Sequence, residues 1–305
     1  MIRYLFTRLA YMLPVVWLVV SVVFLLIHLV PGDPIQAMLG ESAASADIQA
    51  ARHAYGLDVP LSTQYVRYWG GVLHGDLGQS LRLNKPVRSL VAQAYPATLS
   101  LTLSALFVAI LLSIPAGVRS ATRRNRWDDR ALSFVSLLGL SFPNFALGPI
   151  LILLFAIHFD WLPVSGAASA RSLILPAITM GASLAAILTR MVRTSMLEEL
   201  GQDYIRTARA KGLPERTVII RHAMRPALMP VLSLFTSIAL SSITAAIVTE
   251  TVFSLPGLGQ LIINGAINRD YTLVLGLVVL VTAIAVLFNL IVDLLYAAVD
   301  PRIRY

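Results

Sequence analysis

The sequence predicts an all-α protein that crosses a membrane six times. Of its 305 residues, 57% are hydrophobic and only 13% are charged, whereas a soluble domain carries about 25% charged residues. Six uncharged stretches follow one another along the chain, and each approaches or exceeds the roughly 20 residues that a membrane helix needs. The basic residues collect in alternate connecting segments, which is typical of polytopic membrane proteins.

The uncharged stretches define the expected helices, because each is dominated by Leu, Ile, Val, Ala and Phe. The first stretch is too long for the apolar region of a signal peptide, so a retained helix is expected. The stretch Thr251–Asn268 contains Pro256 and three glycines, which favours a short interfacial or partly re-entrant segment. The spanning helices are expected near residues 10–30, 98–118, 134–157, 173–192, 228–249 and 272–294.

The distribution of Arg and Lys predicts the orientation. The N-terminus, the 119–130 and 190–225 connections and the C-terminus together carry 17 basic residues, and the other segments carry 7. Cytoplasmic segments are enriched in Arg and Lys, so both termini are expected in the cytoplasm. The segment 31–97 is then external. Its aromatic residues alternate with polar ones and predict a small folded cap (Tyr55, Tyr65, Tyr68 and Trp69).

The expected spans lack the residues that several membrane functions need. Ion-coupled transporters and voltage sensors need ionisable groups within the bilayer. Asp293 comes closest, and an interfacial position or pairing with Arg302 or Arg304 is favoured over a proton relay. The paired aspartates, the serine–base arrangement and the zinc-binding pattern of intramembrane proteases are missing from the spans, which disfavours an intramembrane hydrolase.

The sequence also lacks a nucleotide site of the usual kind. It contains no G-x-x-x-x-G-K-[ST] phosphate loop and no cysteine, so energy for uphill transport has to come from another subunit. The net charge of +8 is spread between apolar stretches and does not form the soluble basic face that nucleic-acid binding requires. The partner is therefore expected to be the lipid bilayer, with no nucleic acid.

The 190–225 connection contains a short helix with start and stop signals. Asp203 is expected to cap its N-terminus, and basic residues in its last turn suit the helix dipole. Gly212 suits the left-handed conformation that ends a helix, and Pro214-Glu215 starts a second helix that leads to Pro226 and Pro230 at the opening of the fifth span. From the residues alone, this pair of helices can lie on lipid headgroups or dock a soluble partner.

The stretch from Asp203 to Gly212 resembles the cytoplasmic E-A-A-x-x-x-G motif of membrane subunits in binding-protein-dependent ABC importers. With Arg221-His222 and Pro230, it is similar to the version in dipeptide, oligopeptide, glutathione and nickel permeases. Arg206 and Thr207 stand where the motif has Glu and Ala, so the role of the Glu is not transferred. Further matching segments are Pro31-Gly32-Asp33-Pro34, Gly56–Leu61, Gly75–Ser80, Asn289–Tyr296 and Asp300–Arg304.

The resemblance implies the permease fold of type I ABC importers in the cell inner membrane. It implies a first helix and external cap over 1–93, a five-helix transmembrane domain over 94–293 with a coupling loop at 190–226, and a cytoplasmic tail over 294–305. It also implies a non-catalytic subunit without a cofactor, because partner subunits bind the ATP. The residues expected to couple to the ATPase are Arg206, Thr207, Ala208, Arg209, Lys211 and Gly212.

The implied partners are a second homologous permease, two ATP-binding subunits and an extracytoplasmic solute-binding protein. The favoured function is ATP-driven import of di- or oligopeptides. Import of nickel or another metal chelate, or of glutathione, is the alternative within the family, and His53 and His74 lie among no clustered ligands that would favour direct metal binding. A passive channel or membrane scaffold is the alternative from another class, and the glycine-terminated helix disfavours it.

Overall fold

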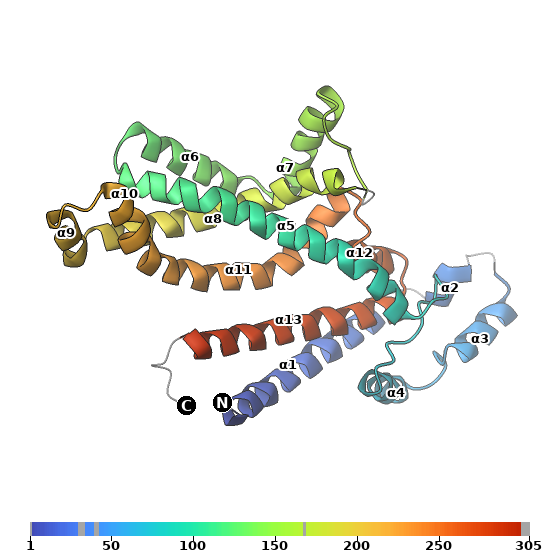
Figure 1. The fold of residues 1–305 in the computed structure, drawn as a ribbon. Helices are drawn as coiled ribbons and strands as arrows, with labels where there is room; N and C mark the ends of the chain where they lie inside the picture. The colour runs from blue at the N-terminus through green and yellow to red at the C-terminus, as the bar shows by residue number, and fades with distance from the viewer. Residues whose placement is uncertain (1, 30–33, 40–42, 167–168, 300–305) are drawn as a thin grey trace. The chain divides into compact units, whose positions relative to one another are not determined.

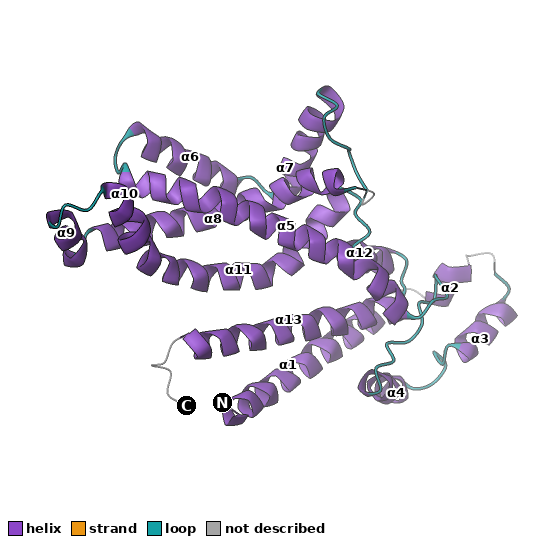
Figure 2. Ribbon diagram, viewed as in Figure 1, coloured by secondary structure: helices purple, strands orange, loops and turns teal. Residues whose placement is uncertain are grey.

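The computed structural model describes residues 2–29, 34–39, 43–166 and 169–299. Every named element in this part of the chain is a helix, which confirms the all-α prediction (Figure 2). The expected Pro31-Gly32-Asp33 motif and the side chains of Asp293, Arg302 and Arg304 lie outside the described residues. Two compact units form: residues 97–259, and residues 1–96 together with 260–305.

The unit 97–259 is organised around helix α8, Ile174–Leu200, which packs against α6, α7 and α11 (Figure 1). Glycines let helix backbones approach closely, because a Cβ on Gly181 would lie 2.8 Å from the carbonyl oxygen of Ala105 in α5. Small residues at such contacts are typical of membrane helices. The helices are α5 (Val87–Thr122), α6 (Trp127–Ser141), α7 (Asn144–Leu151), α8 and α11 (Met224–Val252), with the turns η1 (Ile152–His158) and η2 (Ala170–Leu173).

One end of this unit contains a buried acidic residue, which ends one of the uncharged stretches of the sequence. Glu250 lies within α11 and is fully buried. Its carboxylate accepts hydrogen bonds from the Thr98 hydroxyl at 2.5 Å and from the Gly259 N–H at 2.7 Å. These donors compensate for the loss of water around a buried charge. Nearby, the apolar core consists of Leu101, Ala105, Ala156, Leu175, Met180, Ala246, Phe253 and Leu255.

The second unit pairs the two ends of the chain. Helix α1, Ile2–Leu29, lies beside α13, Tyr271–Val299. The connection after α1 carries three short helices, α2 (Pro34–Leu39), α3 (Ser45–Ala54) and α4 (Leu61–Leu73). The buried Asp270 carboxylate fastens this connection to the start of α13, because it accepts hydrogen bonds from the Ser80 hydroxyl at 2.5 Å and the Leu273 N–H at 3.1 Å.

The number of helices that can cross a membrane is compatible with the six expected. Within the described residues, four are long and apolar enough: Val87–Thr122, Ala170–Leu200, Glu215–Val252 and Tyr271–Leu290. A bent helix pair adds a fifth, and the shorter apolar helix Leu13–Leu29 lies at the place of the first expected span. The helix α12, Leu258–Ile267, forms within the stretch that was expected to be a short segment.

The expected span 134–157 is bent rather than straight. Helix α6 and the run Asn144–His158 meet at an angle of 105°. The break falls at Phe142-Pro143, where Phe142 is extended with φ −86° and ψ 115°. A residue before proline is disfavoured in the helical region, because the proline ring collides with its backbone. The expectation of one straight helix over 134–157 is therefore wrong, because an uncharged window carries no information about such a bend.

The two prolines expected to open the fifth span lie inside a continuous helix instead. The chain runs through α10 (Glu215–Thr217), the π-helical turn η3 (Val218–Ala223) and α11 without an interruption. Pro226 and Pro230 both fall within α11. A proline cannot donate to the carbonyl four residues earlier, and the wider π turn directly before them accommodates an irregular hydrogen-bond pattern. The second helix of the connection is therefore the beginning of the span.

Candidate coupling site

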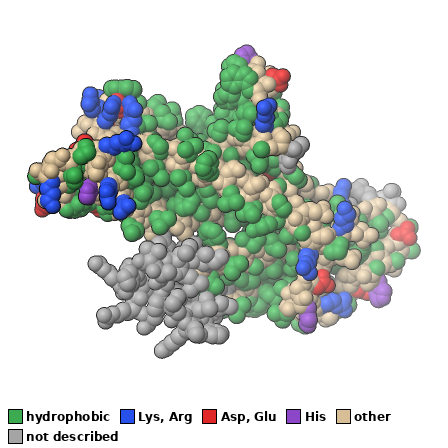
Figure 3. Space-filling view, viewed as in Figure 1, with side chains coloured by type: hydrophobic (Ala, Val, Ile, Leu, Met, Phe, Trp, Pro, Cys, Tyr) green, Lys and Arg blue, Asp and Glu red, His purple; other side chains and the backbone are tan. Residues whose placement is uncertain are grey.

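The short helix α9, Asp203–Ala210, projects from the end of α8 and is followed by a turn into α10. Lys and Arg side chains gather on this end of the 97–259 unit, whereas hydrophobic side chains cover the helices beyond it (Figure 3). This contrast is expected where a membrane helix bundle meets water and headgroups. The region is therefore the part of this unit that a soluble partner can reach.

An apolar face holds α9 against its own chain. The helix packs against η3. Ile205 and Ala208, three residues apart and hence on one face of the helix, are both buried, and so are Val218 and Ala223 of η3. The remaining side chains of α9 are exposed. The helix is thus amphipathic, and its inner face is already occupied.

The start of α9 lacks the expected side-chain cap. Gln202 occupies the cap position with φ −73° and ψ 151°, and no side chain caps the helix there. Asp203 is the first helical residue and forms an exposed pair with Arg206 at 3.3 Å, so the prediction that Asp203 caps the helix is wrong. An acidic residue in the first turn still complements the helix dipole.

Tyr204 links α9 to the end of α8. Its hydroxyl donates a hydrogen bond to the carboxylate of Glu199, the last but one residue of α8. Partial desolvation of this half-exposed ring and the adjacent carboxylate raise the pKa of Tyr204 to about 12. The hydroxyl therefore stays protonated and keeps donating throughout the neutral range.

The end of α9 is a tight, braced turn. Gly212 has φ +75°, and no atom lies within 4 Å of a Cβ built on it, which confirms the expected left-handed helix stop. Arg209 spans the turn with two hydrogen bonds to Glu215, Nη2 to Oε1 at 2.7 Å and Nε to Oε2 at 3.1 Å. Such a two-point contact fixes orientation as well as distance.

The structure assigns different environments to the six predicted coupling residues. Ala208 is buried against its own chain and Arg209 is engaged with Glu215. The Thr207 hydroxyl donates to the carbonyl of Asp203 at 3.0 Å. Arg206 and Lys211 are exposed and are the cations most available to a partner.

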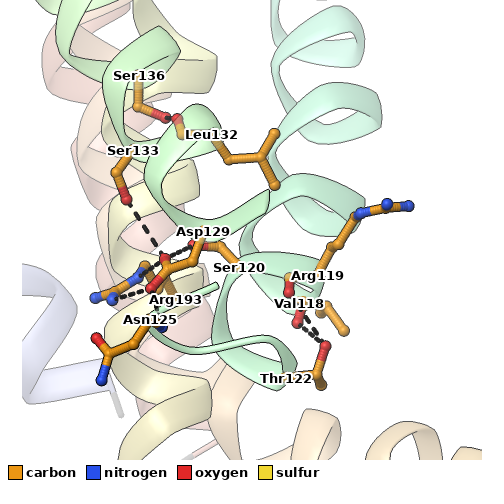
Figure 4. Close-up of polar contacts among 10 residues, drawn as sticks. All are labelled: Val118, Arg119, Ser120, Thr122, Asn125, Asp129, Leu132, Ser133, Ser136 and Arg193. Atoms are coloured by element: carbon orange, nitrogen blue, oxygen red, sulfur yellow. Dashed lines mark hydrogen bonds and ion pairs between the residues drawn. The ribbon is translucent and has the colours of Figure 1, made fainter. Parts of the chain in front are cut away.

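A cluster around Asp129 joins the helix ends next to this site (Figure 4). Arg193 of α8 donates to its two carboxylate oxygens, from Nε at 2.7 Å and from Nη2 at 2.9 Å. The Ser120 hydroxyl of α5 donates at 2.5 Å and the Asn125 N–H at 2.9 Å. One buried carboxylate at the start of α6 therefore fastens the ends of α5, α6 and α8 together.

The neighbouring Asp128 engages two more cations of the same connection. Its Oδ2 lies 2.9 Å from Arg119 Nη2 and 2.7 Å from Arg123 Nη1. In the sequence these arginines indicate only topology, and their structural role as partners of Asp128 is not apparent there. The clue in the sequence is the Asp128-Asp129 pair at the start of a helix, directly after a run of arginines. Ile205 was missed too, although it stands three residues before Ala208 in an otherwise polar helix.

Comparison with known families accounts for this architecture. Residues 113–305 match the model of the binding-protein-dependent transport system inner membrane component. Residues 1–102 match the model of the N-terminal part of the membrane component of such systems. The chain belongs to this family. It is therefore a multi-pass inner-membrane permease component of an ABC importer, in which partner subunits hydrolyse the ATP.

Individual relatives match this chain along its whole length. The chain is 39% identical over 305 residues to the glutathione transport system permease protein GsiC of Escherichia coli O6:H1, covering 100% of both chains. It is 40% identical over 305 residues to the protein of that name from Salmonella paratyphi A, also with 100% coverage of both. The family assignment confirms the expectation of a non-catalytic permease subunit.

Solved structures support the fold. A chain of the inward-facing MetNI methionine ABC transporter superimposes with a TM-score of 0.60 at 21% identity, covering 70% of this chain and 97% of that chain. A chain of an amino acid ABC transporter crystallised with histidines gives a TM-score of 0.54 at 12% identity, covering 70% and 95%. The type I importer permease fold predicted for the chain is thereby confirmed.

Proposed function

We propose that this permease imports short peptides. On this proposal it forms the pathway with a second homologous permease, receives substrate from an extracytoplasmic solute-binding protein and is driven by two ATP-binding subunits. The full-length similarity to permeases named for glutathione, which is itself a tripeptide, supports a peptide-type substrate. Both termini lie in the cytoplasm, as the distribution of basic residues indicates. The five-helix domain over 94–293 carries the transport pathway, and the cap over 31–93 faces the binding protein.

The proposed mechanism rests on how α9 is folded and anchored. Its inner face is anchored by Ile205 and Ala208, its end is stopped by Gly212, and its outer face is polar and exposed. We infer that the ATPase contacts this outer face and the turn after it. Arg206, Thr207 and Lys211 meet the ATPase, while Ala208, Arg209 and Gly212 maintain the shape that is presented.

The contacts of α9 provide a route from the ATPase to the membrane helices. The Tyr204–Glu199 hydrogen bond joins α9 to α8, and packing on η3 joins it to α11. Helices α8 and α11 pack directly against each other. A displacement of α9 by the closing ATPases is therefore delivered to two adjacent helices at once, which biases the equilibrium between the outward- and inward-open pathways.

Transport by the complete complex in proteoliposomes tests the substrate class. Labelled di-, tri- and tetrapeptides, glutathione and a nickel chelate are supplied with the partner binding protein, and ATP is enclosed with the ATPase subunits. The proposal predicts ATP-dependent uptake of one or more peptides. Glutathione is the second candidate, favoured by the names of the relatives. Uptake confined to the nickel chelate, or uptake without ATP, contradicts the proposal.

A further inference from the structure

The external connection contains a helix that touches α1 well below its end. The Tyr65 hydroxyl of α4 lies 2.6 Å from the Ser21 hydroxyl of α1. One turn further along α1, the ring of Phe24 contacts the ring of Tyr65 edge-on, with centroids 5.3 Å apart. Still nearer the end, His28 Nε2 lies 3.3 Å from Gln64 Oε1. Helix α4 therefore crosses α1 over its last two turns.

The depth of these contacts follows from helix geometry. Helix α1 ends at Leu29, and Ser21 stands eight residues earlier, which corresponds to about 12 Å at a rise of 1.5 Å per residue. The helix is apolar from Leu13 to Leu29, so the contact with Ser21 falls inside the apolar part. A helix resting there lies at the boundary of the hydrocarbon and not out in water.

Helix α4 has three distinct sides when its residues are spaced 100° apart. One side faces α1 and carries Gln64, Tyr65 and Tyr68. One flank carries Val66 and Leu73, which are 70% and 80% exposed. A third side carries Arg67, which is exposed and lies about 100° or more around the helix from Val66 and Leu73. The two most exposed large apolar side chains of α4 thus share one flank, while Leu61 in its first turn is 49% exposed.

The order of the contacts along α1 shows which flank points toward the bilayer centre. Tyr65 meets the deeper residue Ser21, and Gln64 meets the shallower residue His28. Continuing around α4 from Gln64 past Tyr65 leads to Leu73 and Val66. The bare apolar flank is therefore the deep one.

The Arg67 side of α4, which adjoins Gln64, carries the loop before the helix. The Gln64 side-chain amide donates to the carbonyl of Val59 at 2.9 Å. A Cβ on Gly56 would lie 2.6 Å from Nη1 of Arg67, so the loop before α4 covers the Arg67 side. Polar groups and loop therefore lie on the shallow side, away from Val66 and Leu73. This arrangement matches a helix lying in a membrane interface.

We propose that α4 is an interfacial helix whose Val66 and Leu73 enter the acyl region of the leaflet at the C-terminal end of α1. The partner of this surface is the lipid itself. The external connection is then not only a cap in water, because one of its helices is held in the membrane surface. It follows that the loop carried on the Arg67 flank has a fixed height above the bilayer.

Spin labelling tests this directly, because the sequence contains no cysteine. Single cysteines replace Val66, Leu73 or, as the matched control on the same helix, Arg67. Each variant carries a nitroxide and is measured in the assembled transporter in lipid nanodiscs. We expect collisions with oxygen to exceed collisions with a water-soluble nickel chelate at V66C and L73C, and the reverse at R67C. The ratio should differ several-fold between the two flanks.

Two results would overturn the proposal. Nickel access at V66C and L73C equal to that at R67C would place the flank in water. Exclusion of both reagents would show that another protein covers it. The unmodified chain offers a second measurement that is independent of labelling, in reconstituted membranes with a photoactivatable phospholipid. Lipid adducts are expected on residues of α4 and not on α3, and adducts confined to the spanning helices would contradict the proposal.

Discussion

At the turn after α9, a single backbone angle directs the chain from one helix into the next. Gly212 has φ +75° and open space around the position of a Cβ. Substitution there is opposed by backbone strain alone and not by a collision. A β-branched residue in this conformation costs about 1–2 kcal/mol, whereas Asn tolerates it well.

Gly212→Val should therefore misdirect the turn and reduce ATP-dependent uptake, and Gly212→Asn should retain most of it. The measurement is uptake by the reconstituted complex together with the amount of ATPase subunit that co-purifies. Membrane insertion of both variants should equal that of the wild type. Equal activity of the two variants would show that the left-handed turn is not needed.

The carboxylate of Asp129 is the second residue with a large expected effect. Asp129→Asn leaves Arg193 facing a neutral amide in a largely buried cluster. Hydrogen bonds to charged groups contribute about 1.5–3 kcal/mol each, so the free energy of unfolding should fall by about that amount. Asp203→Asn is the matched control, since its pair with Arg206 is exposed and worth less than about 1 kcal/mol. Reversible denaturation in bicelles measures both, and equal losses would contradict the assigned role of Asp129.

At the scale of the element, the two sides of α9 differ: one side packs against the rest of this chain, and the other is exposed. Ala208 is buried and Ala210, two residues later, is exposed. The same substitution at the two positions therefore separates anchoring from partner contact.

Ala208→Glu should detach α9 from η3 even when no ATPase is present, because a carboxylate would have to enter an apolar contact. Amide hydrogen exchange in α9 of the isolated chain should rise by about tenfold or more, equivalent to about 1.4 kcal/mol. Ala210→Glu should leave that exchange unchanged. If exchange in α9 is the same in both variants, the helix is not anchored through Ala208.

Local signals in the sequence predicted some elements of this fold well. The glycine at 212, the short helix before it and the run of long apolar helices follow from turn chemistry and charge-free windows. The bend at Pro143 has a local signal in the residue before proline, but charge-free windows do not detect it. The continuation of one helix through Pro226 and Pro230 did not follow from such signals, because it depends on how the helix accommodates missing donors. The role of Asp129 was also hidden, since Ser120 and Arg193 come together only through packing.

The whole molecule is expected to have both termini in the cytoplasm. The motivation is the 17 basic residues in one set of segments against 7 in the other, together with the rule that cytoplasmic segments are basic. Reporter fusions at Ser45 and Ala168 should give an external signal, and fusions at Asn125 and Gly201 a cytoplasmic one. A cytoplasmic signal at Ser45 with an external one at Asn125 would refute this orientation. The division into domains at residues 93 and 94 stays a prediction.

The central claim is that the exposed face of α9 and its turn meet the ATPase subunits. Photocrosslinking in the assembled transporter tests this most directly, with a cysteine-linked photoreactive group at Thr207 or Lys211 and a control group at Ala50 of α3. All three positions are exposed. The account predicts adducts with the ATPase subunit from positions 207 and 211 and none from position 50. Absence of ATPase adducts at both α9 positions, or equal adducts from position 50, would contradict it.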